Sequence, residues 1–166
     1  MTQLTLDIRH EAPADAAAIE RLHERAFGPG RFARTAFRLR EGVPPLAELS
    51  FTALVGTLLV GSVRMNAVVA GSAPALVLGP LTVDPSFENR GIGGALTLRA
   101  MEAARAAGHG LVFLVGDEPY YARFGFLVVP DGAVAMPGPV DPRRFLVCEL
   151  QEGALKAASG TLRAAR

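Results

Sequence analysis

The hydrophobic pattern in the first third of the chain predicts one strand followed by helices. In residues 3–9, Leu4, Leu6 and Ile8 alternate with polar neighbours, which is typical of a half-buried strand. Residues 13–27 begin with a proline and then carry apolar side chains three and four positions apart, so a helix is predicted there. A second, weaker and more basic helix is predicted over residues 31–42.

The middle of the chain predicts three strands. Residues 46–54 and 57–70 are rich in apolar and β-branched side chains, and a tight turn at Val55–Gly56 is predicted to join them. Residues 75–83 predict a third strand. Because a proline cannot donate to a strand ladder, Gly79–Pro80 in the middle of this strand indicates a bulge or a lost bond.

The rest of the chain alternates between the two kinds of element. Residues 91–108 predict the clearest helix, and the uninterrupted apolar run 111–115 predicts a central strand that is buried on both faces. Residues 118–124 predict a short helical turn with a proline near its start. The expected buried face of the long helix comprises Ile92, Leu96, Ala100, Ala103 and Ala107, and the expected closing elements are strands at 126–129 and 144–150 and a short helix within 152–166.

This order of elements predicts a mixed α/β (α+β) fold in a single domain, residues 1–166. Half of the residues are hydrophobic, which is enough for a full core, and the net charge of +1 implies no nucleic acid partner. The lone Cys148 excludes an intrachain disulfide and is expected in a buried strand, and the three scattered histidines predict no metal site. The charged N-terminus and the short apolar runs predict neither a secretory signal nor a membrane span, so a cytoplasmic protein is expected.

A glycine-rich turn at residues 91–94 separates the third predicted strand from the long helix. Glycines let the backbone approach an anion closely, and the unpaired N–H groups of a helix N-terminus point toward it. The alternative is a turn that only starts the helix. No lysine follows the glycines as in a P-loop, and Leu96 stands where a dinucleotide fingerprint has its third glycine. The turn therefore predicts an anion cradle outside the common nucleotide motifs.

Two motifs in the same order resemble the GNAT acyltransferase superfamily. The segment "LTVDPSFENRGIGGAL" is similar to its strand, proline turn and glycine-rich helix start, and "PYYARFGF" is similar to its later Y-x-x-x-G-F element. "LGPLTVDP", "GDEPYYARFGF" and "CELQEGAL" further resemble a subgroup of predicted N-acetyltransferases, and the likeness covers most of the chain. The resemblance implies a GNAT-like fold, in which a central, mostly antiparallel twisted sheet is flanked by helices.

The resemblance also implies acetyl-CoA, or another acyl-CoA, as the donor. In such proteins the pantetheine arm pairs with the strand that precedes the glycine turn, and the pyrophosphate rests on the turn. A bulge at Gly79–Pro80 would leave backbone groups of that strand free for a ligand. The residues expected to bind the donor are Leu81, Thr82, Val83, Asn89, Arg90, Gly91, Ile92, Gly93, Gly94 and Ala95.

For catalysis, the resemblance implies direct attack of a primary amine, on a small molecule or a protein, on the thioester. By its offset from Gly125, Tyr121 matches the family tyrosine that protonates the departing thiolate, while Tyr120 is expected to line the core or groove. A backbone N–H near Val83 is expected to stabilise the oxyanion. No general base is assigned, because several carboxylates are possible: Glu41, Glu48, Asp84, Glu88 and Asp117.

Other interpretations remain open at this point. One is a non-catalytic module that binds or senses acyl-CoA, and a weaker one is an enzyme with a nucleotide donor. The arginine-rich segment 28–45 is expected on the acceptor side, where it forms either a solvated basic face or a site for an acidic acceptor. A homodimer is common in such proteins. Glu88 and Asn89 depart from the subgroup's usual Gln-Gly, so Glu88 is expected to face solvent or to pair with Arg90.

Overall fold

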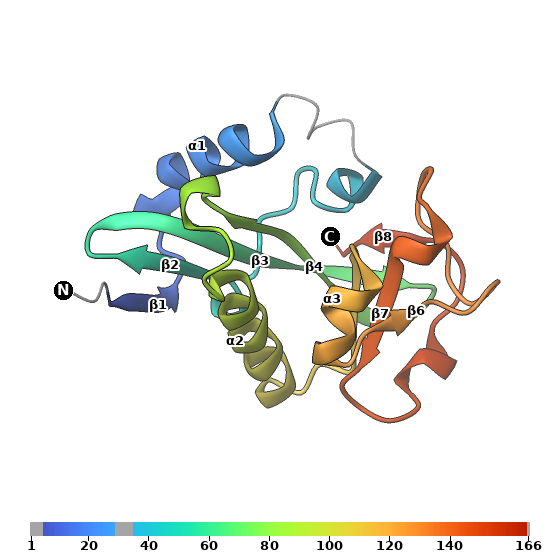
Figure 1. The fold of residues 1–166 in the computed structure, drawn as a ribbon. Helices are drawn as coiled ribbons and strands as arrows, with labels where there is room; N and C mark the ends of the chain where they lie inside the picture. The colour runs from blue at the N-terminus through green and yellow to red at the C-terminus, as the bar shows by residue number, and fades with distance from the viewer. Residues whose placement is uncertain (1–4, 29–34, 166) are drawn as a thin grey trace.

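The structure is a computed structural model that describes residues 5–28 and 35–165. Its centre is an eight-stranded sheet in the order β1-β2-β3-β4-β5-β7-β6, with β8 paired to β3 (Figure 1). Among the described strands β4 and β5 are the parallel neighbours, and the other pairings are antiparallel. The strands are β1 Leu6–His10, β2 Phe51–Val55, β3 Leu58–Ala70, β4 Ala73–Val83, β5 Leu111–Val115, β6 Leu127–Val128, β7 Phe145–Glu149 and β8 Leu162–Ala164.

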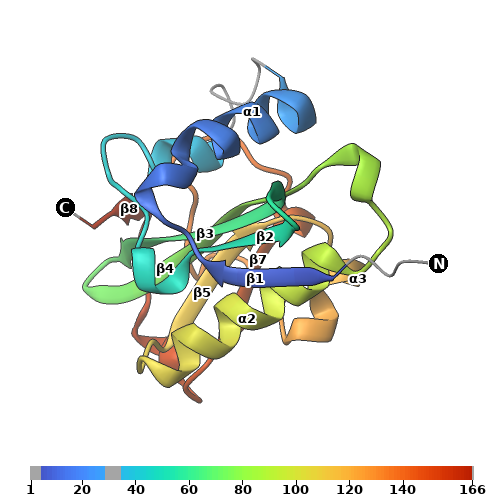
Figure 2. The same ribbon diagram turned by 90° about the vertical axis from the view of Figure 1, so that its left-hand side faces the viewer.

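Two long helices cover opposite faces of this sheet, as Figures 1 and 2 both show. Helix α1 (Ala16–Phe27) packs on β3 and β4, and α2 (Ile92–Ala106) packs on β2, β3 and β4 from the other side. The one-turn helix α3 (Glu118–Tyr121) follows β5. Short 3-10 turns fill the connections: Pro13–Asp15, Thr35–Leu39, Ala47–Leu49, Pro85–Phe87, Ala122–Phe124, Pro142–Arg144 and Ala154–Ala157. The predicted fold class, a mixed sheet flanked by helices, is confirmed.

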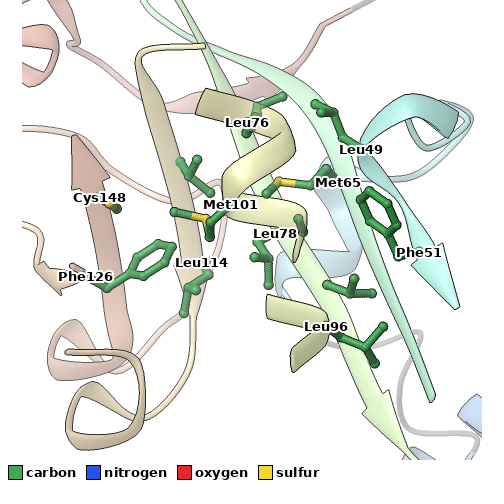
Figure 3. Packing of buried hydrophobic residues seen from close by; sticks show 14 of the residues in the cluster. Leu49, Phe51, Met65, Leu76, Leu78, Leu96, Met101, Leu114, Phe126 and Cys148 are labelled. Carbon is green, nitrogen blue, oxygen red and sulfur yellow. The ribbon is translucent and has the colours of Figure 1, made fainter. Parts of the chain in front are cut away.

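The larger part of the core lies between α2 and the sheet. Figure 3 shows Leu96 and Met101 of α2 facing side chains such as Leu76 and Leu114 on the strands. The predicted buried face of α2 is only partly right, because the face runs in steps of four. It comprises Ile92, Leu96, Ala100 and Ala104, together with Thr97 and Met101, whereas Ala103 is half-buried and Ala107 lies exposed beyond the helix end.

A glycine in β3 brings the start of α2 close to the sheet. A Cβ atom at Gly61 would lie 2.9 Å from the Leu96 Cδ1 atom and 3.1 Å from the Ile92 Cγ2 atom. Any larger side chain at position 61 would therefore push the first turn of α2 away from the strands. This close approach fixes the glycine-rich turn next to the end of β4.

The predicted irregularity in β4 is confirmed. The register with β3 shifts so that Gly79 and Pro80 together stand opposite Arg64, which is a β-bulge, and the Gly79–Pro80 peptide bond is cis. On its other side β4 pairs with β5 only at Leu76 and Val77. The two parallel strands therefore separate after Val77, and the last six residues of β4 have an edge that β5 does not cover.

Several sequence-based boundaries are wrong. Ala47–Leu49 is a 3-10 turn, so β2 begins only at Phe51, and the hairpin turn lies at Gly56–Thr57. Of the predicted helix 31–42, residues 31–34 lie outside the described part, and Thr35–Leu39 is a 3-10 turn. The first strand is confirmed but is mostly exposed, because it forms an edge of the sheet; Leu4 lies outside the described part.

The C-terminal segment differs from the prediction in two places. The predicted short helix is a 3-10 turn at Ala154–Ala157, whereas strand β8, which pairs with Val68–Ala70 of β3, was not predicted. A strand of three residues is too short to show an alternation of apolar and polar positions in the sequence. Cys148 is buried in β7, as expected. Across residues 5–28 and 35–165, none of the helices combines the length and the apolar character needed to cross a membrane.

Candidate functional site

The uncovered edge of β4 presents main-chain groups to the gap between β4 and β5. The Asp84 N–H donates to the Val60 carbonyl at 2.8 Å, so residue 84 forms a hydrogen-bonded pair with β3. In an antiparallel ladder the pairs alternate, so the main-chain groups of Val83 and Leu81 point away from β3. Both residues face the side that β5 has left open. Thr82 lies between them, and its hydroxyl is buried with no hydrogen-bond partner among the residues that the structure describes.

The glycine-rich turn has the backbone of an anion cradle. Gly91 is the N-cap of α2 with φ +79°, and Asn89 also has a positive φ of 62°. The first main-chain bond of the helix runs from the Ala95 N–H to the Gly91 carbonyl at 3.0 Å. The N–H groups of residues 91–94 therefore precede the helical ladder and can meet an anion, whereas the N–H of Ala95 is already used.

The charged residues of the turn lie on its outside. The Arg90 guanidinium stacks over the Phe87 ring, 5.2 Å from its centroid, and both Glu88 and Arg90 are exposed. No ion pair joins Glu88 to any of the described residues. Of the two expectations for Glu88, the exposed position in solvent agrees with the structure. Asp84 anchors the same loop through an ion pair with Arg25 of α1 at 3.0 Å.

Tyr121 lies in the angle where β4 and β5 separate. Its ring packs so closely on Gly116 that a Cβ atom there would lie 2.5 Å from the Tyr121 Cε2 atom. Phe126 meets it edge-on, with 5.9 Å between ring centroids. Burial raises the pKa of the Tyr121 phenol to about 12, with smaller contributions from Tyr120 and Asp117 in the same direction. The phenol therefore keeps its proton throughout the neutral range.

Tyr120 connects this angle to the glycine turn. Its hydroxyl oxygen would lie 3.2 Å from a Cβ atom at Gly93, beside the Val83 and Leu81 side chains. The Tyr120 and Tyr121 rings meet edge-on with centroids 4.8 Å apart. Burial also raises the pKa of Tyr120, while Arg123 opposes that shift. The two tyrosines thus have separate positions, one at the start of α2 and one between the strands.

Both tyrosines line a cavity of about 930 Å³ that opens where β4 and β5 part. One wall is Leu78–Leu81 of β4, and another is Val115–Asp117 at the end of β5. The opposite side consists of α1, the 3-10 turn Thr35–Leu39 and the loop around Pro139–Asp141. Val83 and the glycine turn lie beyond the cavity, along the continuation of the β4 edge.

Two contacts close the side of the cavity that faces away from the sheet. The Thr35 hydroxyl donates to the Pro139 carbonyl, and Arg38 Nη1 donates to the Pro137 carbonyl at 2.9 Å. Arg38 also lies so close to Gly138 that a Cβ atom there would be 2.7 Å from Nη1. These contacts join segments that are about a hundred residues apart in sequence.

Of the five carboxylates considered as bases, only Asp117 lines the cavity. It occupies the N-cap position of α3 but makes no capping bond, and its side chain pairs with Arg144 instead. The other four carboxylates are not among the residues that line it: Glu41, Glu48, Asp84 and Glu88.

Several cavity residues were not identified from the sequence. His23 is almost fully buried on the inner face of α1, and Asn66 of β3 donates through Nδ2 to the Val43 carbonyl at 3.3 Å. Glu20, Arg40 and Arg64 also line the cavity. The sequence holds one signal for His23, namely its place on the apolar stripe of a helix with Ile19 and Leu22. Within the described residues, no three His, Cys, Asp or Glu side chains come together as a metal site requires.

Comparison with known proteins identifies the family. The model of the acetyltransferase (GNAT) family matches residues 16–126. The uncharacterized N-acetyltransferase YjhQ of Escherichia coli is 32% identical over 117 residues, which are 68% of this chain and 65% of that protein. The chain thus aligns with just under two thirds of that relative's length.

Two solved structures extend the likeness over nearly the whole chain. The GNAT family N-acetyltransferase YhbS of Escherichia coli, in complex with CoA, has a TM-score of 0.83 and 25% identity over 99% of this chain and 92% of its own. A GNAT family acetyltransferase of Brucella melitensis, in complex with acetyl-CoA, has a TM-score of 0.61 and 28% identity over 92% of this chain and 99% of its own. The β4 edge, the glycine-rich turn and the matched residues agree: this chain belongs to the GNAT acetyltransferase family.

Proposed function

We propose that the protein transfers an acetyl group from acetyl-CoA to a primary amine, which attacks the thioester directly. The observation that carries this proposal is the uncovered edge of β4, which runs from the cavity to the glycine-rich turn. Acetyl-CoA has its groups in the matching order: the thioester comes first, the peptide-like pantetheine arm next and the pyrophosphate last. The solved relatives that hold CoA or acetyl-CoA support the same donor.

The donor would lie along the β4 edge with its thioester at the cavity and its pyrophosphate at the glycine-rich turn. The amide groups of the pantetheine arm would pair with the outward main-chain groups of Leu81 and Val83, as an added strand does. The pyrophosphate would take the N–H groups of residues 91–94 and the charge of Arg90. The main chain thus supplies most of the donor contacts, and a backbone N–H near Val83 or Leu81 would polarise the acyl carbonyl.

The chemical step would take place where Tyr121 lines the cavity. The neutral amine nitrogen attacks the carbonyl carbon, the oxyanion collapses, and the carbon–sulfur bond breaks. The leaving thiolate takes the phenol proton of Tyr121, which solvent then replaces, and the acetylated nitrogen gives up its own proton. Of the carboxylates considered from the sequence, Asp117 is the one on the cavity wall, where it could receive this proton directly or through water, although its ion pair with Arg144 opposes that role.

The test has two parts. Calorimetry with acetyl-CoA measures donor binding, and a thiol assay measures CoA release across a panel of polyamines, aminoglycosides, amino acids and peptides. Binding together with amine-dependent release supports the transferase. Binding without release from any amine would favour the alternative, a non-catalytic acyl-CoA-binding module, and no binding at millimolar acetyl-CoA would overturn both.

Three further expectations accompany the proposal. Acetyl-CoA is expected to be preferred over longer acyl donors or a nucleotide, which competition experiments check. A homodimer is expected and can be measured by light scattering. A cytoplasmic location is expected from the sequence and can be checked by cell fractionation.

A further inference from the structure

Helix α1, which forms one side of the cavity, is docked on the sheet by a small apolar contact. Ile19 and Leu22 pack with Leu59 of β3 in a cluster of their own, and Ala18 lies at its margin. The buried face of α2, by contrast, belongs to the main core. Because burial of apolar area is the main force that docks a helix, α1 is fixed less firmly than α2.

The sheet surface beneath α1 is partly polar. Thr52, Ser62 and Thr82 stand opposite one another in a row across β2, β3 and β4. The residue that follows each of them packs in the core on the α2 side, so these three side chains point to the side that α1 covers. Their hydroxyls are buried without a hydrogen-bond partner among the residues that the structure describes. Such a row adds less apolar burial than aliphatic side chains would, which gives more weight to the contacts at the ends of α1.

An ion pair holds each end of α1. At its start, Arg9 of β1 donates to the N-cap residue Asp15 at 3.0 Å. In its last turn, Arg25 Nη2 donates to Asp84 Oδ2, also at 3.0 Å. The two arginine side chains are 49% and 47% exposed and the two carboxylates 9% and 14%, so the pairs match in length and in burial. They differ in what they connect to the helix.

The second pair connects α1 to the donor strand. Asp84 directly follows Val83, the last residue of β4. Its N–H donates to the Val60 carbonyl at 2.8 Å, and its Oδ1 atom accepts from the Ser86 N–H at 2.9 Å. Both contacts lie on the sheet side of the loop and do not involve α1. The carboxylate is therefore a fixed point at the end of the donor strand, to which the helix is attached.

We infer that Arg25 is a positioning residue for the acceptor amine, because its ion pair with Asp84 sets the distance between the cavity face of α1 and the donor strand. His23 and Phe27 line the cavity from positions two before and two after Arg25, whereas Arg25 itself is not among the lining residues. Arg25 thus acts through the helix. The inference rests on the proposed acetyl transfer, in which the amine must be held close to the thioester carbon.

The experiment compares two variants that each remove one of these ion pairs. Arg25→Gln removes the pair beside the donor strand, and Arg9→Gln, the matched control, removes the pair at the other end of α1. Acetyl-CoA is the donor, and spermidine, kanamycin, lysine and trialanine represent four classes of amine. For each amine that releases CoA, Arg25→Gln should raise the KM of that amine about threefold to fivefold and change kcat less, whereas Arg9→Gln should leave both within about twofold.

Three further measurements separate positioning from stability. The melting temperature should fall by a similar amount in both variants, because the two pairs match. The Kd for acetyl-CoA should stay within about twofold in both, since Asp84 keeps its contacts with Val60 and Ser86. Arg25→Lys keeps the charge without the fork of the guanidinium, and it should restore most of the affinity for the amine.

Hydrogen exchange tests the same contact without an acceptor. Residues 24–28 comprise the last turn of α1 and its C-cap, where the Gly28 N–H donates to the Glu24 carbonyl at 3.0 Å. The amides of this segment should exchange about threefold faster in Arg25→Gln than in the wild type, because the end of the helix opens more often. In Arg9→Gln they should exchange at the wild-type rate.

The outcomes separate this inference from the proposed function. Equal changes in the KM of the amine in Arg25→Gln and Arg9→Gln, or no change in Arg25→Gln, would overturn the role of Arg25 and leave acetyl transfer intact. A rise in the Kd for acetyl-CoA as large as the rise in that KM would locate the effect in the donor turn and overturn it as well. No CoA release by the wild type with any amine would overturn acetyl transfer, and the role of Arg25 with it.

Discussion

The donor side and the acceptor side of the site differ in what they are built from. The donor side is one continuous stretch of chain, from β4 through the glycine-rich turn into α2, and its main chain offers the contacts. The acceptor side assembles side chains from α1, the turn Thr35–Leu39 and the loop near residue 140, which are distant in sequence. The comparison suggests why a family can keep its donor while its acceptors vary: main-chain groups survive substitution, whereas side chains do not.

The largest expected effect lies where the two sides meet. Tyr121→Phe removes the proton donor but keeps the ring that packs on Gly116, so kcat should fall ~100-fold while the Kd for acetyl-CoA stays within about twofold. Steady-state kinetics and calorimetry measure the two quantities. Tyr120→Phe is the matched control and should lower kcat far less. Equal losses of kcat in both variants would show that Tyr121 has no special role in proton transfer.

The second prediction concerns the main chain of the donor side. In Gly91→Ala the new Cβ atom meets nothing within 4 Å, but φ of +79° is a left-handed conformation that strains alanine. The strain of ~1–2 kcal/mol should shift the turn and raise the Kd for acetyl-CoA roughly fivefold or more. Gly153→Ala provides the control, since Gly153 has a φ of +82° and equally open surroundings but lies far along the chain, beside Ala154–Ala157.

Both glycine variants should lose thermal stability to a similar degree, whereas only Gly91→Ala should bind acetyl-CoA more weakly. Unchanged donor affinity in Gly91→Ala would mean that the turn does not hold the pyrophosphate through its main chain.

The third prediction tests whether the acceptor side can be altered alone. Thr35→Val keeps the side-chain shape and removes the hydrogen bond from the Thr35 hydroxyl to the Pro139 carbonyl. Such a bond contributes about 1 kcal/mol, so a loosened wall should raise the KM for the acceptor roughly threefold. The rise should be the same for anionic and neutral amines, since no charge changes. A matching rise in the Kd for acetyl-CoA would show that the two sides are coupled.

The difference between the two sides also decides how much the sequence could predict. The donor side was predictable because it is local: Gly91, Gly93 and Gly94 stand next to each other, and the motif around Tyr121 has a fixed offset from Gly125. The bulge at Gly79–Pro80 was predictable because proline lacks an N–H. Arg40 was predicted only as part of the arginine-rich segment 28–45, and His23 was not assigned to a site, because only the folded chain brings α1 and the turn Thr35–Leu39 opposite β4.

A fourth prediction concerns pH and follows from the burial of Tyr121. Because its pKa is raised to about 12, the protonated acid persists well above the usual range of a phenol. The rate should therefore rise with pH as the acceptor amine loses its proton, and Tyr121 should cause no fall below about pH 10. A pH profile of kcat for the wild type and Tyr121→Phe checks this. A descending limb near pH 9, present only in the wild type, would contradict the buried position of the phenol.

The smallest effect is expected at Glu88, on the outer face of the donor turn. A carboxylate close to the pyrophosphate would repel it, but this side chain is exposed, where water and salt screen its charge. Glu88→Gln should therefore change the Kd for acetyl-CoA by less than about twofold, because surface charges interact weakly. Arg90→Gln, two positions along the same turn, removes an equally exposed charge of opposite sign and should raise the Kd by about twofold or less, with the rise confined to low salt. Calorimetry on both variants at two salt concentrations compares the effects. If Glu88→Gln tightened binding and Arg90→Gln weakened it, each by about fivefold or more, then both side chains would face the pyrophosphate, and the donor side would depend on its side chains as strongly as the acceptor side does.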